Sequence, residues 1–98
     1  MSLPSTEQLE KTAFILKTIA HPMRLQVVCL LGKHERLSVS EICSHVNCEQ
    51  SLVSHHLNLL KMKGVLVSER HGKNIFYSLQ MRSVLGVLDC VDSCGKSD

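Results

Sequence analysis

The chain has 98 residues, of which 44% are hydrophobic, and it carries a formal net charge of +2. This length allows one domain, 1–98, and so much apolar content excludes a disordered chain. No stretch approaches about 18 consecutive apolar residues, and the N-terminus lacks the features of a signal peptide, so we expect a cytoplasmic protein without a membrane span. The five cysteines then point to redox chemistry, metal binding or packing rather than to a disulfide framework.

Four helices are predicted in the first two thirds of the chain. Residues 5–20 form a helix with two apolar sides, one of which is available to a partner, and Pro22 opens a second helix that ends near Gly32. Ser38 and Glu41 have the spacing of a capping box for a third helix, 39–46, which Asn47 closes. A fourth helix covers about 49–62 and ends before Gly64.

A β-hairpin and a last helix complete the pattern. Two β-rich runs, 65–70 and 74–79, flank His71-Gly72-Lys73, which predicts a hairpin with a basic tip. Apolar spacing predicts a fifth helix over 81–94. The fold class is therefore mainly α with a small β-hairpin, in the order ααααββα. Two short helices, about 39–63, followed by a hairpin wing, about 65–79, form a winged helix-turn-helix.

The fourth helix and the hairpin are the predicted DNA-binding elements. Residues 51–82 carry five Lys and Arg against one Glu, a balance typical of a nucleic-acid surface. A helix fits the major groove, and its N-terminal half reaches the base edges. We expect Leu52, Val53 and Leu57 to face inward. The residues expected to contact bases or phosphates are Gln50, Ser51, Ser54, His55, His56, Lys61, Lys63, Arg70 and Lys73, although an ordinary solvated surface is the plain alternative.

Four segments together form a specific pattern: HPMRL at 21–25, LSVSEI at 37–42, QSLVSHHLNLLKMKGVL at 50–66 and GKNIFYSL at 72–79. In these segments the chain resembles the ArsR/SmtB family of bacterial repressors, and the match covers nearly all of it. The resemblance implies a homodimer joined through the first and fifth helices, about 5–20 and 81–94. It also implies binding to double-stranded DNA at an inverted-repeat operator, with an effector that releases the DNA.

The resemblance also bears on the effector. Many arsenic and cadmium sensors of the family carry Cys-Val-Cys where this chain has Ser38-Val39-Ser40, and zinc sensors carry acid and histidine ligands at the positions of Met81, Ser83 and Cys94. Neither ligand set is present. The subgroup that this chain resembles most is that of the dithiol sensors of persulfide and reactive sulfur (the SqrR, BigR and HlyU type). That likeness implies a redox sensor made of Cys29 and a second thiol, Cys94 or Cys90.

Other interpretations of the cysteines stay open. Cys90 and Cys94 share a helix face at i, i+4, so their thiolates are an alternative site for arsenite, cadmium or zinc as effector; otherwise no metal or cofactor is expected. A third possibility is that these thiols sense nothing, and Cys43 and Cys48 are expected to be structural. A winged helix used only for protein interaction is a rival function. A thiol enzyme is not expected, because the chain has no Cys-x-x-Cys.

Overall fold

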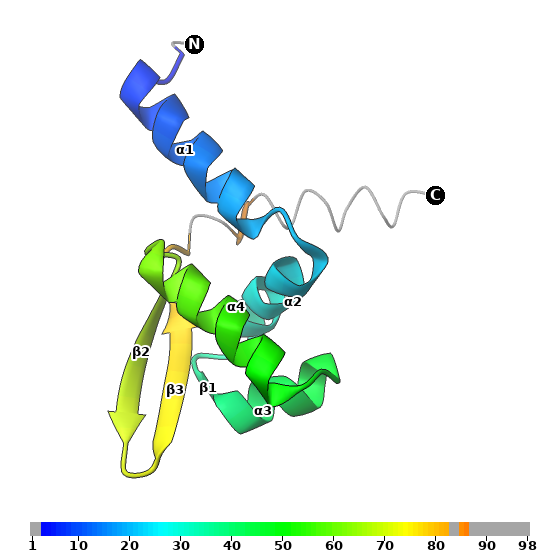
Figure 1. The fold of residues 1–98 in the computed structure, drawn as a ribbon. Helices are drawn as coiled ribbons and strands as arrows, with labels where there is room; N and C mark the ends of the chain where they lie inside the picture. Colours follow the sequence, from blue (N-terminus) through cyan, green and yellow to red (C-terminus); the bar gives the residue numbers. More distant parts are fainter. Residues whose placement is uncertain (1–2, 83–84, 87–98) are drawn as a thin grey trace.

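Four helices and a three-stranded sheet make up the fold in the computed structural model, which describes residues 3–82 and 85–86. In chain order they are α1 (Thr6–Ile19), α2 (Pro22–Lys33), β1 (Leu37–Ser38), α3 (Val39–Val46), α4 (Gln50–Met62), β2 (Leu66–His71) and β3 (Asn74–Leu79) (Figure 1). The predicted winged helix-turn-helix is confirmed. Most of the fifth helix predicted over 81–94 lies outside the described residues.

Local hydrogen bonds explain where the helices begin. The Ser38 hydroxyl accepts from the Glu41 amide at 3.2 Å, and the Glu41 carboxylate accepts from the Ser38 amide at 2.9 Å, which confirms the predicted capping box. Asn47 ends α3 with a left-handed φ of 51°. The second helix was predicted to end near Gly32, and it ends at Lys33.

The sheet is antiparallel, with the strand order β1-β3-β2. The two-residue strand β1 was not predicted, because so short a segment has no periodicity and is defined only by its pairing with β3. The hairpin strands β2 and β3 join through Gly72 and Lys73, and Gly72 has a φ of +64°, which glycine adopts without strain. This hairpin is the wing.

The hydrophobic core lies between α2, α3, α4 and the sheet. It consists of aliphatic side chains and Tyr77: Ile19, Val27, Val28, Leu31, Leu37, Ile42, Val46, Val53, Leu57, Leu60, Val65, Leu66, Tyr77 and Leu79.

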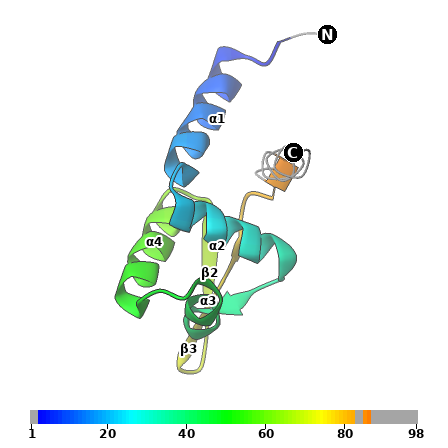
Figure 2. The ribbon, with the colours of Figure 1, turned by 90° about the vertical axis from the view of Figure 1, so that its right-hand side faces the viewer.

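Helix α1 contacts this core through Ile19 and the half-buried Ile15, near its C-terminal end. Its only buried residues are Thr18 and Ile19, in its last turn. Leu9, Phe14 and Leu16 are 53%, 48% and 39% exposed, and both ribbon views show the helix projecting away from the other elements (Figures 1 and 2). Most of the apolar surface predicted for residues 5–20 is therefore uncovered in the single chain.

Candidate nucleic-acid interface

The inward side of α4 is a stripe of four residues at the spacing i, i+3, i+4 and i+7. Val53, His56, Leu57 and Leu60 are buried there. The prediction that Leu52 faces inward is wrong, since its side chain is 46% exposed. Because successive residues in a helix are 100° apart, Leu52 and Val53 cannot both lie at the centre of one face. His56, and not Leu52, lies on the buried side with Val53.

The outward side of α4 carries short polar side chains. Gln50, Ser51 and His55 are exposed and Ser54 is half-buried, all in the N-terminal half of the helix that the sequence assigned to base contacts. The predicted phosphate contacts are exposed as well: Lys61, Lys63, Arg70 and Lys73. The structure therefore leaves eight of the nine predicted residues accessible to DNA.

The ninth residue, His56, is only 5% exposed and was wrongly placed among the DNA contacts. Its Nδ1 accepts a hydrogen bond from Arg24 Nε at 3.2 Å, and its ring centroid lies 4.6 Å from that of His21. Burial, followed by the charges of His21, Arg24 and His55, lowers the pKa of His56 below the ordinary value for histidine. The stripe spacing 53, 56, 57, 60 is the sequence signal that could have placed His56 inside.

Helix α4 and the wing meet at a shallow hollow of about 170 Å³. Gln50 from the first turn of α4 and Lys73 from the wing turn lie on its wall. The remaining lining comes from the start of α3 and the first residues of β3: Ser38, Val39, Ser40, Asn74 and Ile75. The fold thus brings one predicted base contact and one predicted phosphate contact to the same place.

The outer face of the wing holds a cluster that the sequence did not reveal. Arg36 Nη1 lies 3.5 Å from Glu69 Oε1 and 3.0 Å from His71 Nε2, and its guanidinium carbon is 4.9 Å from the centre of the Phe76 ring. His71 contacts Glu69 Oε1 at 2.6 Å, and this hydrogen bond is the main reason that the pKa of Glu69 is lowered. Nothing in the local sequence around Arg36 indicates these contacts, because its partners are more than 30 residues away.

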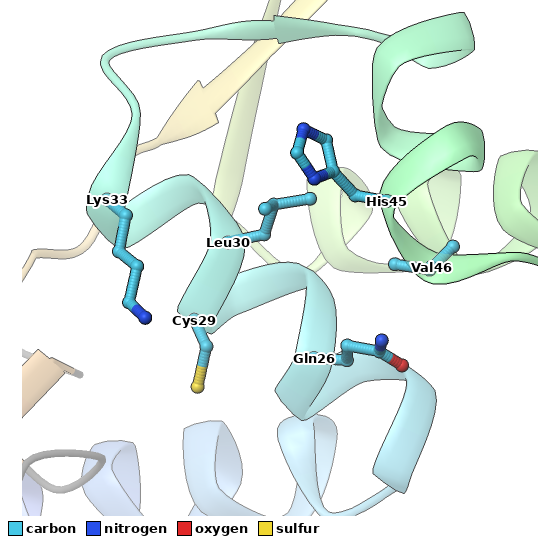
Figure 3. Close-up of a pocket in the computed structure, with 6 residues that line it drawn as sticks. All are labelled: Gln26, Cys29, Leu30, Lys33, His45 and Val46. Carbon is cyan, nitrogen blue, oxygen red and sulfur yellow. The ribbon is translucent and has the colours of Figure 1, made fainter.

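Cys29 is exposed on α2, although it stands between aliphatic residues in the sequence. It lines a hollow of about 200 Å³ between α2 and α3, with Gln26, Leu30, Lys33, His45 and Val46 (Figure 3). In Figure 3 the Cys29 and Lys33 side chains point along the same side of α2, and His45 lies across the hollow on α3. Cys43 and Cys48 are half-buried and pack against the core, as predicted.

The chain after β3 returns to α2 close to Cys29. A Cβ atom built on Gly32 would lie 2.5 Å from Leu85 Cδ2, so Leu85 packs directly on the α2 backbone at that position. Gly32 is three residues after Cys29 and therefore on the same side of the helix. Cys90 and Cys94, the predicted partners of Cys29, lie outside the described residues.

Two further observations concern only residues 3–82 and 85–86. No three His, Cys, Asp or Glu side chains come together there in an arrangement that could hold a metal ion. No single helix in that part is long and apolar enough to cross a membrane; α1 and α2 together have the length and composition, but they meet at a bend of 105°.

Comparison with known proteins places the chain in a family. The family model described as "Bacterial regulatory protein, arsR family" matches residues 21–68, from the residue before α2 into β2. The transcriptional repressor PagR of Bacillus anthracis is 46% identical over 81 residues, which are 82% of this chain and 80% of PagR. The chain belongs to the arsR family of bacterial regulatory proteins.

Solved structures agree with this assignment. HlyU from Vibrio cholerae N16961 superposes with a TM-score of 0.81 at 28% identity, covering 89% of this chain and 97% of HlyU. The repressor BigR from Xylella fastidiosa superposes with a TM-score of 0.81 at 29% identity, covering 93% of this chain and 96% of BigR. The expected resemblance to the ArsR/SmtB family is confirmed.

Family membership settles the class of function. An arsR-family regulator binds DNA through its winged helix-turn-helix and controls transcription, and it is not an enzyme. The exposed residues of α4 and the wing are the surface of this chain available for that task.

Proposed function

We propose that this regulator is a homodimeric repressor that binds an inverted-repeat operator and releases it when a thiol-directed effector acts on Cys29. Repression is supported by relatives such as PagR, which is named a transcriptional repressor. A protein that acts on chromosomal DNA is expected in the cytoplasm.

The uncovered apolar side of α1 supports the dimer. Leu9, Phe14 and Leu16 are large side chains left 39–53% exposed in the single chain. Full burial of each such side chain stabilises an interface by about 1.5–3 kcal/mol, and half of that gain remains available at these positions. A second copy of α1, together with the segment 81–94, would cover this surface.

The exposed side of α4 supports the docking geometry. In a helix-turn-helix the N-terminal residues of the second helix reach the base edges of the major groove, while flanking basic residues contact phosphates. Ser54 and His55 are central to that side of α4. Replacing either with alanine should weaken operator binding by about 1 kcal/mol or more, which a fluorescence-anisotropy titration would detect. Unchanged affinity in both variants would remove this side of α4 from the interface.

The observation that carries the sensing proposal is the exposure of Cys29 beside the place where Leu85 packs on α2. A cysteine thiolate is the nucleophile of sulfur chemistry, so an accessible thiol is the first requirement. Cys29 would attack a polysulfide or persulfide and take up one sulfur atom, with the remaining sulfur fragment leaving as a thiolate. Attack by the thiol of Cys94 or Cys90 on this Cys29 persulfide would then form a disulfide and release hydrogen sulfide, so no cofactor is needed.

The experiment uses sodium tetrasulfide with the reduced protein and a duplex that the protein selects from a random pool. We expect Cys29→Ser to keep operator affinity in the reduced state and to lose the release caused by tetrasulfide. Cys43→Ser is the matched control, because that thiol is half-buried in α3 and should leave the response intact. Mass spectrometry after proteolysis should find Cys29 linked to Cys94 or Cys90.

Two results would contradict the proposed effector. Release by tetrasulfide that persists in Cys29→Ser removes the α2 thiol from sensing. The other result is release of DNA by arsenite, cadmium or zinc but not by tetrasulfide. If that release is lost in Cys90→Ser and Cys94→Ser, these two cysteines bind a metal or metalloid, as in the alternative interpretation.

A further inference from the structure

The side chain of Arg24 joins three helices. It lies in the first turn of α2 and is half-buried. Its Nη1 donates to the carbonyl oxygen of Thr18 in α1 at 2.9 Å, and its Nε donates to Nδ1 of His56 in α4 at 3.2 Å. The planar guanidinium directs these two bonds at a fixed angle, so Arg24 fixes the last turn of α1 relative to the middle of α4.

The two hydrogen bonds of Arg24 form a bridge between Thr18 in α1 and His56 in α4. At its α1 end the bridge contacts a backbone carbonyl that needs a hydrogen-bond donor. The last four carbonyl groups of a helix have no amide of their own helix to accept from, and the carbonyl of Thr18 belongs to that set. A positive charge is also favourable there, because the C-terminal end of a helix carries partial negative charge. Arg24 therefore both satisfies the end of α1 and holds it.

The α4 end of the bridge requires a neutral histidine. Because Nδ1 of His56 accepts from Arg24, the proton of the ring is on Nε2. The groups that face this ring are His21 at 4.6 Å, the neighbouring His55 at 5.5 Å and Arg24 itself. Burial of the ring, followed by the charges of these three groups, lowers the pKa of His56 and so favours the neutral form that accepts the bond.

Few other contacts within the described part of the chain fix the direction of α1. Apart from its buried last turn, α1 packs on the core through the half-buried Ile15, and its Phe14 ring centre lies 5.2 Å from Nζ of Lys63, the residue that follows α4. An exposed cation–π contact of this kind is weak, at about 0.5–1 kcal/mol. The orientation of the projecting helix thus depends strongly on the bridge between Thr18, Arg24 and His56.

A small change of this orientation has a large effect at the far end of α1. The helix has 14 residues, which at 1.5 Å per residue gives a length of about 21 Å. A tilt of about 10° would move its far end by about 3.6 Å, close to the rise of one base pair, which is about 3.4 Å.

From this geometry we infer that the Thr18–Arg24–His56 bridge determines which spacing between operator half-sites the protein accepts. The inference rests on the proposed function, in which α1 joins two copies and each α4 enters one half-site. The distance between two recognition helices must match the half-site separation along the DNA, normally about 34–36 Å. When the bridge holds α1, only one half-site spacing places both α4 helices in register with the DNA. Without the bridge, neighbouring spacings also become acceptable.

The test compares two substitutions at His56 that differ in the acceptor. His56→Asn keeps an oxygen near the position of Nδ1, whereas His56→Leu keeps a buried side chain of similar size without an acceptor. Each protein is titrated with duplexes that carry the two half-sites selected by the wild type at the preferred spacing, and with one base pair added or removed. A duplex with a single half-site gives the reference affinity, and sedimentation gives the oligomeric state.

We expect the wild type and His56→Asn to prefer one spacing. For His56→Leu, the ratio of the affinities for the preferred and the neighbouring spacings should fall by about tenfold or more, when each affinity is divided by that protein's own affinity for the single half-site. Arg24→Lys should behave like His56→Leu, and it provides the same test at a half-buried position if His56→Leu does not fold. A purely structural role would lower all affinities together and leave the spacing preference unchanged, and that result would overturn the inference. A wild type that is monomeric or indifferent to spacing overturns the proposed dimer and this inference together, and it is recognised before any variant is measured.

Discussion

Replacing Gly32 with alanine tests the packing of Leu85 on α2. The added methyl carbon would lie 2.5 Å from Leu85 Cδ2, whereas carbon atoms in good contact are about 3.5–4.0 Å apart, so the Leu85 side chain must move by about 1 Å or change rotamer. Because the obstructing atom is the end of a flexible side chain and not backbone, this overpacking costs about 1 kcal/mol, at the low end of the usual range. Alanine is also the better helix former by up to about 1 kcal/mol, and less here because Gly32 lies in the last turn of α2. We therefore expect the two effects nearly to cancel, so that Gly32→Ala leaves the free energy of unfolding almost unchanged.

A double-mutant cycle separates the two effects. In a Leu85→Ala background the obstructing carbon is gone, and Gly32→Ala should then stabilise the protein by about 0.5–1 kcal/mol. Urea unfolding followed by circular dichroism, at one fixed protein concentration for all four proteins, gives the values. If Gly32→Ala has the same effect in both backgrounds within about 0.5 kcal/mol, Leu85 does not pack there. In that case the chain after β3 does not return to α2 beside Cys29.

Four further predictions concern the helices and the sheet. Ser38→Ala should cost about 1 kcal/mol in urea unfolding, because α3 loses its cap. Hydrogen bonds from Ser38 lower the pKa of Glu41, so the stability that wild type gains over Glu41→Gln should be present above pH 4.5 and disappear as the pH falls through the lowered pKa. Leu52→Ala should change the free energy of unfolding by less than about 1 kcal/mol and Val53→Ala by about 2 kcal/mol, because only Val53 is buried; equal losses would contradict the orientation of α4. Burial raises the pKa of Tyr77, the only tyrosine, so its absorbance should titrate above pH 10 in the folded protein and lower after unfolding in urea.

The helix-turn-helix could be predicted from the sequence because its signals are local. The capping box of Ser38 and Glu41 joins residues three apart, and Asn47 ends α3 through its own backbone conformation. The two-residue turn at Gly72 likewise depends on neighbouring residues. Hydrogen bonds of this range form between groups that the chain brings together in almost any compact state, so residue identity and spacing suffice to predict them.

The orientation of α4 was only partly predictable. Periodicity identified Val53 and Leu57 as inward-facing, but the ordinary preference of leucine for the interior and of histidine for the surface assigned Leu52 and His56 to the wrong sides. Histidine is buried here because Arg24, 32 residues away, supplies the hydrogen bond that makes burial tolerable. Helical spacing therefore predicts the burial of side chains on α4 better than residue type does.

By itself the sequence determined the order of the four helices and the hairpin, the cap of α3, the family and the exposed polar side of the recognition helix. Only the tertiary structure decided that Cys29 is exposed, that Arg36 joins Glu69 and His71 on the wing, and that Leu85 packs on Gly32. Each of these facts depends on side chains that are distant in the chain and that approach only after the helices and the sheet have packed. Periodicity and local hydrogen bonding carry no information about such approaches, because many different packings satisfy the same local pattern.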